Sequence, residues 1–310
     1  MTTATCALIA NPAAGGGRTA RLLGALRDRL PGSLGEATTL ACTTRPGEGR
    51  DLARQALARG ARHLVVVGGD GTIHEVVNGI HDAGAGLAEE VVLSIISTGT
   101  GCGLALSLGI PADLDAQLAI AGGAHARRID LGRVTLEGPG PSAWFVNECQ
   151  VGLGAEVVRR TSGSRKARGG SLAYFLTTAQ LLLRYPTCRV EVLLGDGTRH
   201  AMPVTGIAIG NGAMTAGGMR LTPRAAMDDG LLDLLVIRSP TILRRVIDLA
   251  RVPSGRHVTS PGCDYLQAPC AALSSSAEIP VSADGELIGS LPARFECRPR
   301  TLRVHCPPVH

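Results

Sequence analysis

The chain has 310 residues, of which 45% are hydrophobic and 18% are charged, a composition typical of a globular protein. Aromatic residues make up only 2% of the chain, which argues against nucleic-acid recognition by base stacking, and we expect no nucleic-acid partner. The formal net charge is +5 and Lys166 is the only lysine, which excludes a Walker A loop and the protein-kinase lysine.

Cysteine usage and apolar segments indicate the compartment. The nine cysteines are odd in number and contain no Cys-x-x-Cys spacing, so we expect reduced thiols. The N-terminal residues lack the charged start and long apolar core of a signal peptide. The longest apolar stretch, residues 171–183, is too short to span a bilayer. The sequence therefore predicts a cytoplasmic protein.

Strand and helix patterns alternate over the first 130 residues. Apolar, strand-like runs at residues 6–10, 37–44, 64–67 and 91–97 are separated by helix-like segments. This alternation predicts a parallel sheet with helices on both faces. Gly-rich loops at residues 11–18, 68–72 and 98–103 follow three of these strands. We expect the three loops to line one ligand site, because ligands bind at the carboxyl ends of parallel strands.

The loop Gly68-Gly69-Asp70-Gly71-Thr72 joins a buried strand to a helix. The helix is predicted from a 3.6-residue apolar period at Ile73, Val76, Val77 and Ile80. Glycines let a ligand approach the backbone, and the N–H groups of a helix start attract phosphate. The Asp70 carboxylate would repel phosphate unless a cation mediates, which suggests a polyphosphate with Mg²⁺. The simpler alternative is an ordinary turn capped by Thr72.

From about residue 131 short alternating runs, separated by turn residues, predict an antiparallel β-sandwich. Two helical interruptions are expected, at residues 171–184 and 240–252. The predicted fold class is therefore an α/β N-terminal domain followed by an antiparallel β-sandwich domain, with boundaries at 1–130 and 131–310. The sequence leaves open whether the last strand returns to the first domain.

Motifs in both halves together resemble the diacylglycerol kinase catalytic-domain superfamily, which contains bacterial lipid kinases, sphingosine kinases and ceramide kinases. The most specific motif is the stretch from GNG to DDGLLD in the second half. GGDGT is less specific, because NAD kinases and phosphofructokinases have a similar loop. The motifs in chain order are NPAAGGGR, CTTRPGEG, GGDGTIHEVVNG, STGTGCGLALSLGIP, IDLGRV, FVNECQVGLGAEVV, IGNGAMTAGGMRLTPRAAMDDGLLDLLVI and ADGELIG.

This resemblance implies a first domain like that of phosphofructokinases and NAD kinases, with ATP bound between the two domains. It implies an ATP- and Mg²⁺-dependent lipid kinase whose substrate is a lipid hydroxyl. Thr43 is preferred to Thr44 by its spacing to Gly47, and turn chemistry is the alternative for Thr100. The implied nucleotide contacts are Asn11, Thr43, Gly68, Gly69, Asp70, Gly71, Thr72, Ile73, His74 and Thr100.

The resemblance also implies a metal loop and a general base in the second half. Ala226 and Leu231 would supply backbone carbonyls and Asp229 a carboxylate, an oxygen set that suits Mg²⁺. An acidic turn before a strand is the alternative. Glu286 is the predicted catalytic base, with its neighbour Asp284 assigned to the turn. Asp70 is the second predicted catalytic residue and the alternative base.

One loop departs from the pattern of bacterial diacylglycerol kinases. Those enzymes usually read Gly-Thr-Gly-Asn-Asp where this chain has Cys102 and Gly103 at the last two positions. The change removes a polar, partly anionic pair, which puts the acceptor in doubt. Two alternatives therefore stay open: a kinase for a soluble acceptor such as NAD, and a non-catalytic nucleotide- or lipid-binding homologue.

Within residues 159–186, five basic residues (Arg159, Arg160, Arg165, Lys166 and Arg168) precede an apolar, helix-like face. Cations beside an apolar face suit anionic lipid surfaces. We therefore expect peripheral contact with the inner face of the membrane through this segment; a core helix beside a solvated basic loop is the alternative. The sequence does not decide whether the protein is a homodimer.

Overall fold

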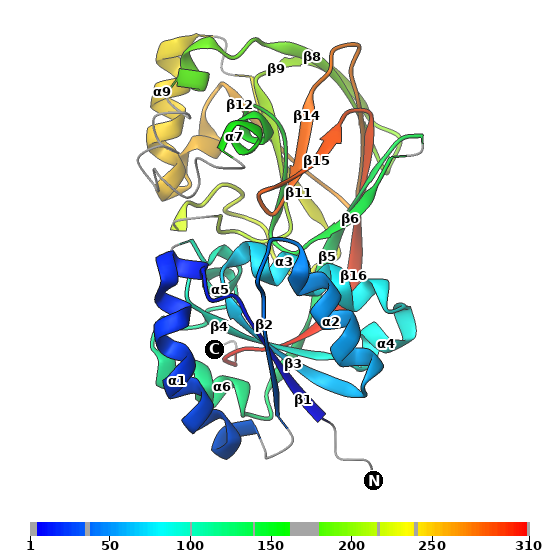
Figure 1. Ribbon diagram of the computed structural model, residues 1–310. Coiled ribbons are helices and arrows are strands. Elements are labelled where there is room, and N and C mark those ends of the chain that lie inside the picture. Colours follow the sequence, from blue (N-terminus) through cyan, green and yellow to red (C-terminus); the bar gives the residue numbers. More distant parts are fainter. Residues whose placement is uncertain are drawn as a thin grey trace. The chain divides into compact units, whose positions relative to one another are not determined.

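The computed structural model describes residues 5–34, 38–99, 101–138, 140–161, 180–215, 218–238 and 241–308. The chain divides into two compact units (Figure 1). The first unit contains residues 1–131, 215–218 and 299–310, and the second contains residues 132–214 and 219–298. Two long strands, β5 (Ala126–Leu136) and β16 (Ala293–His305), each run from one unit into the other.

The first unit is built on a parallel sheet whose strand order is β2-β1-β3-β4-β16. The strands that precede β5 are β1 (Thr5–Ala10), β2 (Thr39–Cys42), β3 (Ala61–Gly68) and β4 (Val92–Ser97). Residues 64–67 of β3 are fully buried, as expected for a central strand covered on both faces. Arg303 and Val304 of β16 pair with β4, so the last strand does return to the first unit.

Helices lie on both sides of this sheet and confirm the α/β prediction. In Figure 1, α1 and α6 lie on one side and α2 and α3 on the other. The helices are α1 (Ala14–Leu34), α2 (Glu48–Ala58), α3 (Asp70–Asp82), α4 (Ala85–Glu90), α5 (Gly103–Ser107) and α6 (Leu114–Ala121). The predicted apolar face of α3 is buried against β3.

The second unit contains two antiparallel sheets packed over one core, which confirms the sandwich prediction. One sheet has the order β12-β11-β10-β7-β14-β15, and the other contains β9, β8, β13, the first part of β16, β5 and β6. Their bounds are β6 (Ser142–Phe145), β7 (Glu148–Gly152), β8 (Cys188–Leu194), β9 (Arg199–Val204), β10 (Gly206–Gly210), β11 (Leu232–Ile237), β12 (Cys263–Ala268), β13 (Cys270–Ser274), β14 (Pro280–Ala283) and β15 (Glu286–Ser290).

Both sheets of the second unit contribute to a single apolar core. Phe145 and Phe295 come from one sheet and Ile209 and Leu234 from the other, and all four side chains are fully buried. Gly132 of β5 makes room for this packing, because a Cβ atom there would lie 2.0 Å from the ring of Phe145. The packing of this core fixes the positions of the strands. The turns between these strands carry the site residues that were predicted in the second unit.

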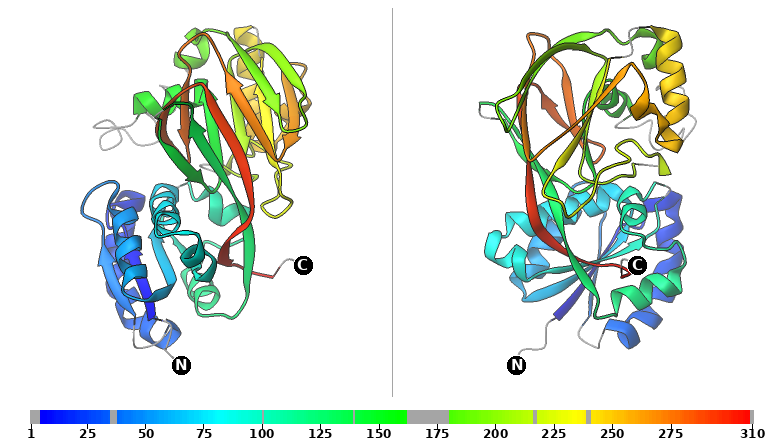
Figure 2. Two further views of the ribbon diagram at one scale, coloured as in Figure 1. Left: turned by 90° about the vertical axis from the view of Figure 1, so that its right-hand side faces the viewer. Right: turned by 180° about the vertical axis from the view of Figure 1, so that it is seen from behind.

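Helices of the second unit lie outside this core (Figure 2). They are α7 (Leu153–Thr161), helical residues 180–184, α9 (Ile242–Arg251) and the 3₁₀ segments η2 (Val252–Ser254) and η3 (Arg256–Thr259). Of the helix predicted over residues 171–184, residues 171–179 lie outside the described part. Among the described helices, none has both the length and the apolar character needed to cross a membrane.

Candidate functional site

The three Gly-rich loops of the first unit meet at the carboxyl ends of β1, β3 and β4. A Cβ atom at Gly15 would lie 2.2 Å from the carbonyl oxygen of Thr98, and one at Gly99 would lie 2.8 Å from the Cα of Gly69. Backbone therefore packs directly on backbone at both contacts, and only glycine fits at Gly15 and Gly99. The predicted convergence of these loops is present in the structure.

Asn11 and Thr72 join the first two loops. Asn11 Nδ2 donates to Thr72 Oγ1 at 3.0 Å, and the backbone N–H of Ala13 donates to Asn11 Oδ1 at 3.0 Å. The backbone N–H of Asn11 donates to the carbonyl of Val67, the next-to-last residue of β3. Both side chains were predicted as nucleotide contacts from separate motifs. The structure brings them together and holds the first loop against the second.

Asp70 joins the second loop to the third. Its Oδ2 accepts a hydrogen bond from the backbone N–H of Gly103 at 3.0 Å, and its Oδ1 accepts from Leu104 at 3.3 Å. These N–H groups belong to the first turn of α5, where an anionic side chain compensates donors that have no helical partner. The structure therefore gives Asp70 the geometry of a brace between the second and third loops.

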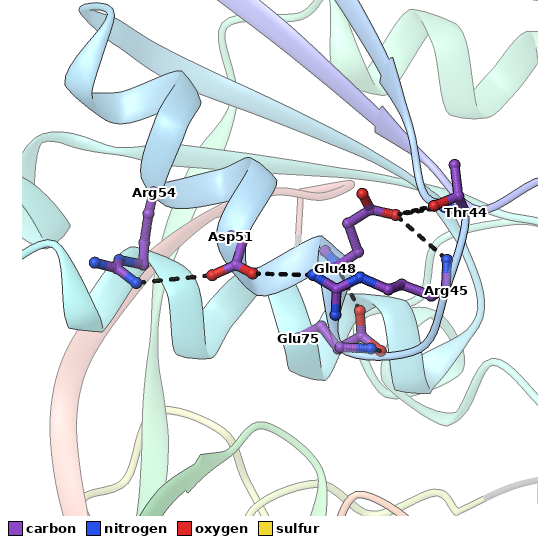
Figure 3. Close-up of polar contacts among 8 residues, drawn as sticks. Thr44, Arg45, Glu48, Asp51, Arg54 and Glu75 are labelled. Carbon is purple, nitrogen blue, oxygen red and sulfur yellow. Dashed lines mark hydrogen bonds and ion pairs between the residues drawn. The ribbon is translucent and has the colours of Figure 1, made fainter.

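The loop after β2 is held by two glutamates (Figure 3). Glu48 Oε2 accepts from the backbone N–H and the hydroxyl of Thr44, and Glu75 accepts from the backbone N–H groups of Gly47 and Gly49, each at 2.8 Å. Because the Thr44 hydroxyl donates to Glu48, the structure is compatible with the preference for Thr43. Sequence reasoning missed Glu75, although it lies within the GGDGTIHEVVNG motif.

The remaining predicted nucleotide contacts differ in their exposure to solvent. Ile73 and His74 are buried on α3, at 1% and 8% exposure, so their side chains are largely shielded from solvent. Gly68 has no room for a side chain, since a Cβ atom would lie 2.7 Å from Thr72 Oγ1. Gly71 is partly exposed in the first turn of α3. Thr100 lies outside the described residues.

Cys102 adopts an unusual backbone conformation in the third loop. Its φ is +43°, in the left-handed region that L residues other than Asn and Asp seldom enter. Its Sγ donates to the carbonyl of Gly99 at 3.0 Å, and burial raises the pKa of the thiol. Cys102 is thus a neutral, locally bonded thiol. The next residue, Gly103, contributes only its N–H group, to Asp70.

In the second unit, Asp284 and Glu286 occupy different environments. Asp284 lies in the turn between β14 and β15 with φ +46°, and Gly285 has φ +83°. The Asp284 carboxylate accepts from the backbone N–H groups of Val146, Asn147 and Glu148, at 2.8, 2.9 and 3.1 Å. Glu286 is the first residue of β15 and is exposed. Asp284 therefore fastens the turn that presents Glu286.

The predicted metal loop forms an Asx turn. Asp229 Oδ1 accepts from the backbone N–H of Leu231 at 2.9 Å, and Asp229 is exposed while Ala226 and Leu231 are partly buried. Over the described part of the chain, no three His, Cys, Asp or Glu side chains lie together as a metal site. Of the three predicted ligands only Asp229 supplies a side-chain carboxylate, and one carboxylate does not by itself form a Mg²⁺ site.

Asp233, four residues further on, is a buried acid that sequence reasoning missed. Its Oδ1 accepts from Gln267 Nε2 at 3.1 Å, and burial raises the pKa of its carboxyl to about 6. The sequence signal for this buried acid is that Asp233 is the third acidic residue after Asp228 and Asp229 and lies near the start of an otherwise apolar strand.

A parallel α/β unit with three converging Gly-rich loops, joined to a β-sandwich, is the architecture of the phosphotransferases that this chain matches. Two family models match the chain: the diacylglycerol kinase catalytic domain over residues 5–134, and the YegS C-terminal NAD kinase beta sandwich-like domain over residues 147–306. The chain therefore belongs to the YegS-like and diacylglycerol kinase family of lipid kinases.

Individual relatives agree with this assignment. The chain is 32% identical to a Chromohalobacter salexigens protein named "Probable lipid kinase YegS-like", over 77% of this chain and 74% of the relative. It is 26% identical to the diacylglycerol kinase of Staphylococcus carnosus, over 88% and 86% of the two chains. A crystal structure of a diacylglycerol kinase from Bacillus anthracis shares the fold, with a TM-score of 0.77, 23% identity and 99% coverage of both chains.

Proposed function

We propose that the chain transfers the γ-phosphoryl group of ATP to a hydroxyl group of a lipid such as diacylglycerol. The observation that carries the proposal is the convergence of three Gly-rich loops, fastened by Asp70 and Asn11, in a member of a lipid kinase family. Phosphoryl transfer depends mainly on positioning and charge stabilisation, which such loops supply through backbone N–H groups.

The first unit fits the phosphates of ATP. Gly71 at the start of α3 presents backbone without a Cβ atom, as do Gly16 and Gly17, which have left-handed, non-helical backbone near the start of α1. A Cβ atom at Gly16 or Gly17 would meet nothing within 4 Å. These positions leave space where a phosphate group can approach the backbone closely. In this proposal Asn11, Thr43 and Thr72 orient the nucleotide.

Mg²⁺ enters the proposal with the nucleotide. The cation would supply charge neutralisation to the transferred group, and Mg²⁺ in such sites takes few protein ligands. Both carboxylate oxygens of Asp70 already accept N–H groups, so its role here is to hold the loops. Asp229 remains the carboxylate proposed for the separate loop at Ala226 and Leu231.

Glu286 is proposed as the general base. A lipid alcohol is a weak nucleophile at neutral pH, and a carboxylate that takes its proton aids attack on the γ-phosphorus. Glu286 sits on a strand end that Asp284 anchors with three hydrogen bonds, which limits its movement. The leaving group is ADP, and the proton passes to the carboxylate.

The lipid acceptor places the reaction at a membrane surface, and we propose that the protein acts on the cytoplasmic face of the inner membrane. The segment 159–186 stays a proposed contact; its residues 162–179 lie outside the described part of the chain. One experiment tests the function: incubation with labelled ATP and Mg²⁺ and separate acceptors, including diacylglycerol, monoacylglycerol, phosphatidylglycerol, sphingosine, ceramide and NAD.

Label in a lipid product supports the proposal. Label in NAD alone would identify a kinase of a soluble acceptor, and ATP binding without transfer to any acceptor would identify a non-catalytic homologue. Cys102 and Gly103 stand where bacterial diacylglycerol kinases usually have Asn-Asp, so the non-catalytic outcome has to be tested. If label enters a lipid product, chelation of Mg²⁺ should abolish this transfer.

A further inference from the structure

Helix α9 presents three apolar side chains to solvent and buries two charged side chains against the protein. Ile242, Leu243 and Val246 are 51%, 70% and 46% exposed, whereas Arg245 and Asp248 are 8% and 5% exposed. The exposed residues are spaced i, i+1 and i+4 and share one face of the helix. Helices at the surface of a globular protein ordinarily show the reverse arrangement.

Buried hydrogen bonds fix α9 in this orientation. Arg245 Nη1 donates to the backbone carbonyls of Leu182 at 3.1 Å and Tyr185 at 2.7 Å, and Nη2 donates to Thr187 Oγ1 at 3.3 Å. The two carbonyls lie at the end of helical residues 180–184, where they have no helical partner. Turning the apolar face of α9 inward would break these three hydrogen bonds. The two carbonyls would lose their donor, and a guanidinium that never loses its charge would lose its partners.

An exposed leucine and several cations lie on or beside α9. Helical residues 180–184 lie beside α9 in Figures 1 and 2, and Leu183 among them is 50% exposed. Arg184 and Arg251 are exposed and Arg244 is partly exposed. The single acid of α9, Asp248, is buried on the opposite side. We call Ile242, Leu243 and Val246 the α9 face.

We propose that the α9 face docks on an anionic lipid bilayer, with its apolar side chains inserted at the interface and its arginines on lipid phosphates. Helices that lie in a membrane interface combine an apolar face with a basic border in this way. Arginine binds phosphate oxygens through a planar fork of donors. The inference deepens the proposed function, since it rests on a lipid acceptor that resides in a bilayer.

Charge favours a bilayer over a second copy of the chain. A symmetric dimer would place the same patch on both sides of the interface. Arg244 and Arg251 would then approach the arginines of the other copy, and like charges across an interface are unfavourable. A bilayer that contains phosphatidylglycerol offers the opposite charge.

The test is co-sedimentation of the full chain with vesicles of phosphatidylcholine, alone and mixed with phosphatidylglycerol. We expect binding to the mixed vesicles and about tenfold weaker partitioning for Leu243→Gln/Val246→Gln, because two inserted aliphatic side chains are lost. Glutamine matches leucine and exceeds valine in helix propensity, so α9 is retained. Arg244→Gln/Arg251→Gln should reduce the preference for phosphatidylglycerol.

Leu193→Gln, at a 37% exposed leucine on β8, is the matched control and should bind as the wild type does. Equal binding of wild type and Leu243→Gln/Val246→Gln would overturn the inference. So would a wild-type dimer in sedimentation velocity, without vesicles, that the same variant converts to a monomer. Phosphorylation of a dispersed short-chain diacylglycerol without vesicles reports the proposed function separately, and Leu243→Gln/Val246→Gln should leave its rate unchanged.

Discussion

The Oδ2 atom of Asp70 accepts a hydrogen bond from the backbone N–H of Gly103 at 3.0 Å, across 33 positions of sequence. This bond ties the GGDGT loop at the start of α3 to the loop that precedes α5. Any displacement of either loop changes the spacing of the backbone N–H groups that are proposed to hold the phosphates. Asp70 is therefore a positioning residue in the proposed reaction.

Asp70→Asn should lower kcat by at least about 100-fold while the fold is kept. An amide can accept only one of the two N–H groups, and its own NH₂ would face the other donor, so the loops separate locally. Steady-state kinetics with a lipid acceptor measures the loss, and circular dichroism checks the fold. Asp82→Asn, at the far end of the same helix, is the control. Near-normal turnover of Asp70→Asn would contradict the positioning role.

Glu286→Gln should lower kcat by about 10²–10⁴-fold and leave the Kd for ATP nearly unchanged, because only the basicity of an exposed side chain is lost. Kinetics and ATP titration of the same variant measure the two quantities. If turnover is unaffected in Glu286→Gln, Glu286 is not the base, and Asp70 becomes the alternative.

Asp284→Asn should act on stability. Asp284 accepts three backbone N–H groups, and an amide at this position would set its NH₂ against one of the donors. We expect the free energy of unfolding to fall by about 1–3 kcal/mol. Denaturant unfolding measures the loss; a variant as stable as the wild type would show that the turn does not depend on this carboxylate.

Gly99→Ala and Gly69→Ala probe the two sides of one backbone contact. A Cβ atom at Gly99 would lie 2.8 Å from Gly69 Cα, whereas one at Gly69 would lie 3.5 Å from Gly99 Cα, an ordinary van der Waals distance. Without nucleotide, Gly99→Ala should lose about 1–3 kcal/mol of stability and Gly69→Ala much less. Equal unfolding midpoints for the two variants would show that the loops are not in contact.

A buried histidine predicts a pH dependence of stability. The Ser94 hydroxyl is hydrogen-bonded to His63 Nε2 at 2.7 Å and to His305 Nδ1 at 2.8 Å, joining β3, β4 and β16. Burial, and secondarily the nearby His305, lowers the pKa of His63 from 6.5 to about 4. Burial also lowers the pKa of His305, with smaller contributions from Arg303 and His125.

Between pH 6.5 and about 4 the unfolded chain therefore binds a proton that folded His63 does not. The free energy of unfolding should fall as pH drops through this range, by at most about 3 kcal/mol from His63. Denaturant unfolding at several pH values measures the slope. His63→Gln should flatten it, and His200→Gln on β9 should not. A slope unchanged by His63→Gln would refute the assignment.

The sequence predicted the elements whose signal is local. The buried run at residues 64–67 and the apolar period of α3 identify the central strand and its helix without reference to the rest of the chain. The convergence of the three loops followed from the general position of ligands in parallel sheets. Asp284 could be separated from Glu286 because Asp-Gly is a turn signal.

Features that depend on distant residues could not be predicted in this way. The hydrogen bond from the Gly103 N–H to the Asp70 carboxylate depends on how two loops pack. Neither loop alone specifies this bond. The α9 segment has an amphipathic pattern, but periodicity does not say which face points inward. That choice is made by Arg245, whose partners at Leu182, Tyr185 and Thr187 lie about 60 residues earlier.

The most direct test of the central claim is a competition between acceptors. The wild-type chain is given γ-labelled ATP, Mg²⁺, diacylglycerol in detergent micelles and NAD in one reaction, and the organic and aqueous phases are separated. The account predicts label in phosphatidic acid in the organic phase, and its loss in Asp70→Asn. Label transferred to NAD, with none in the lipid product, would contradict it.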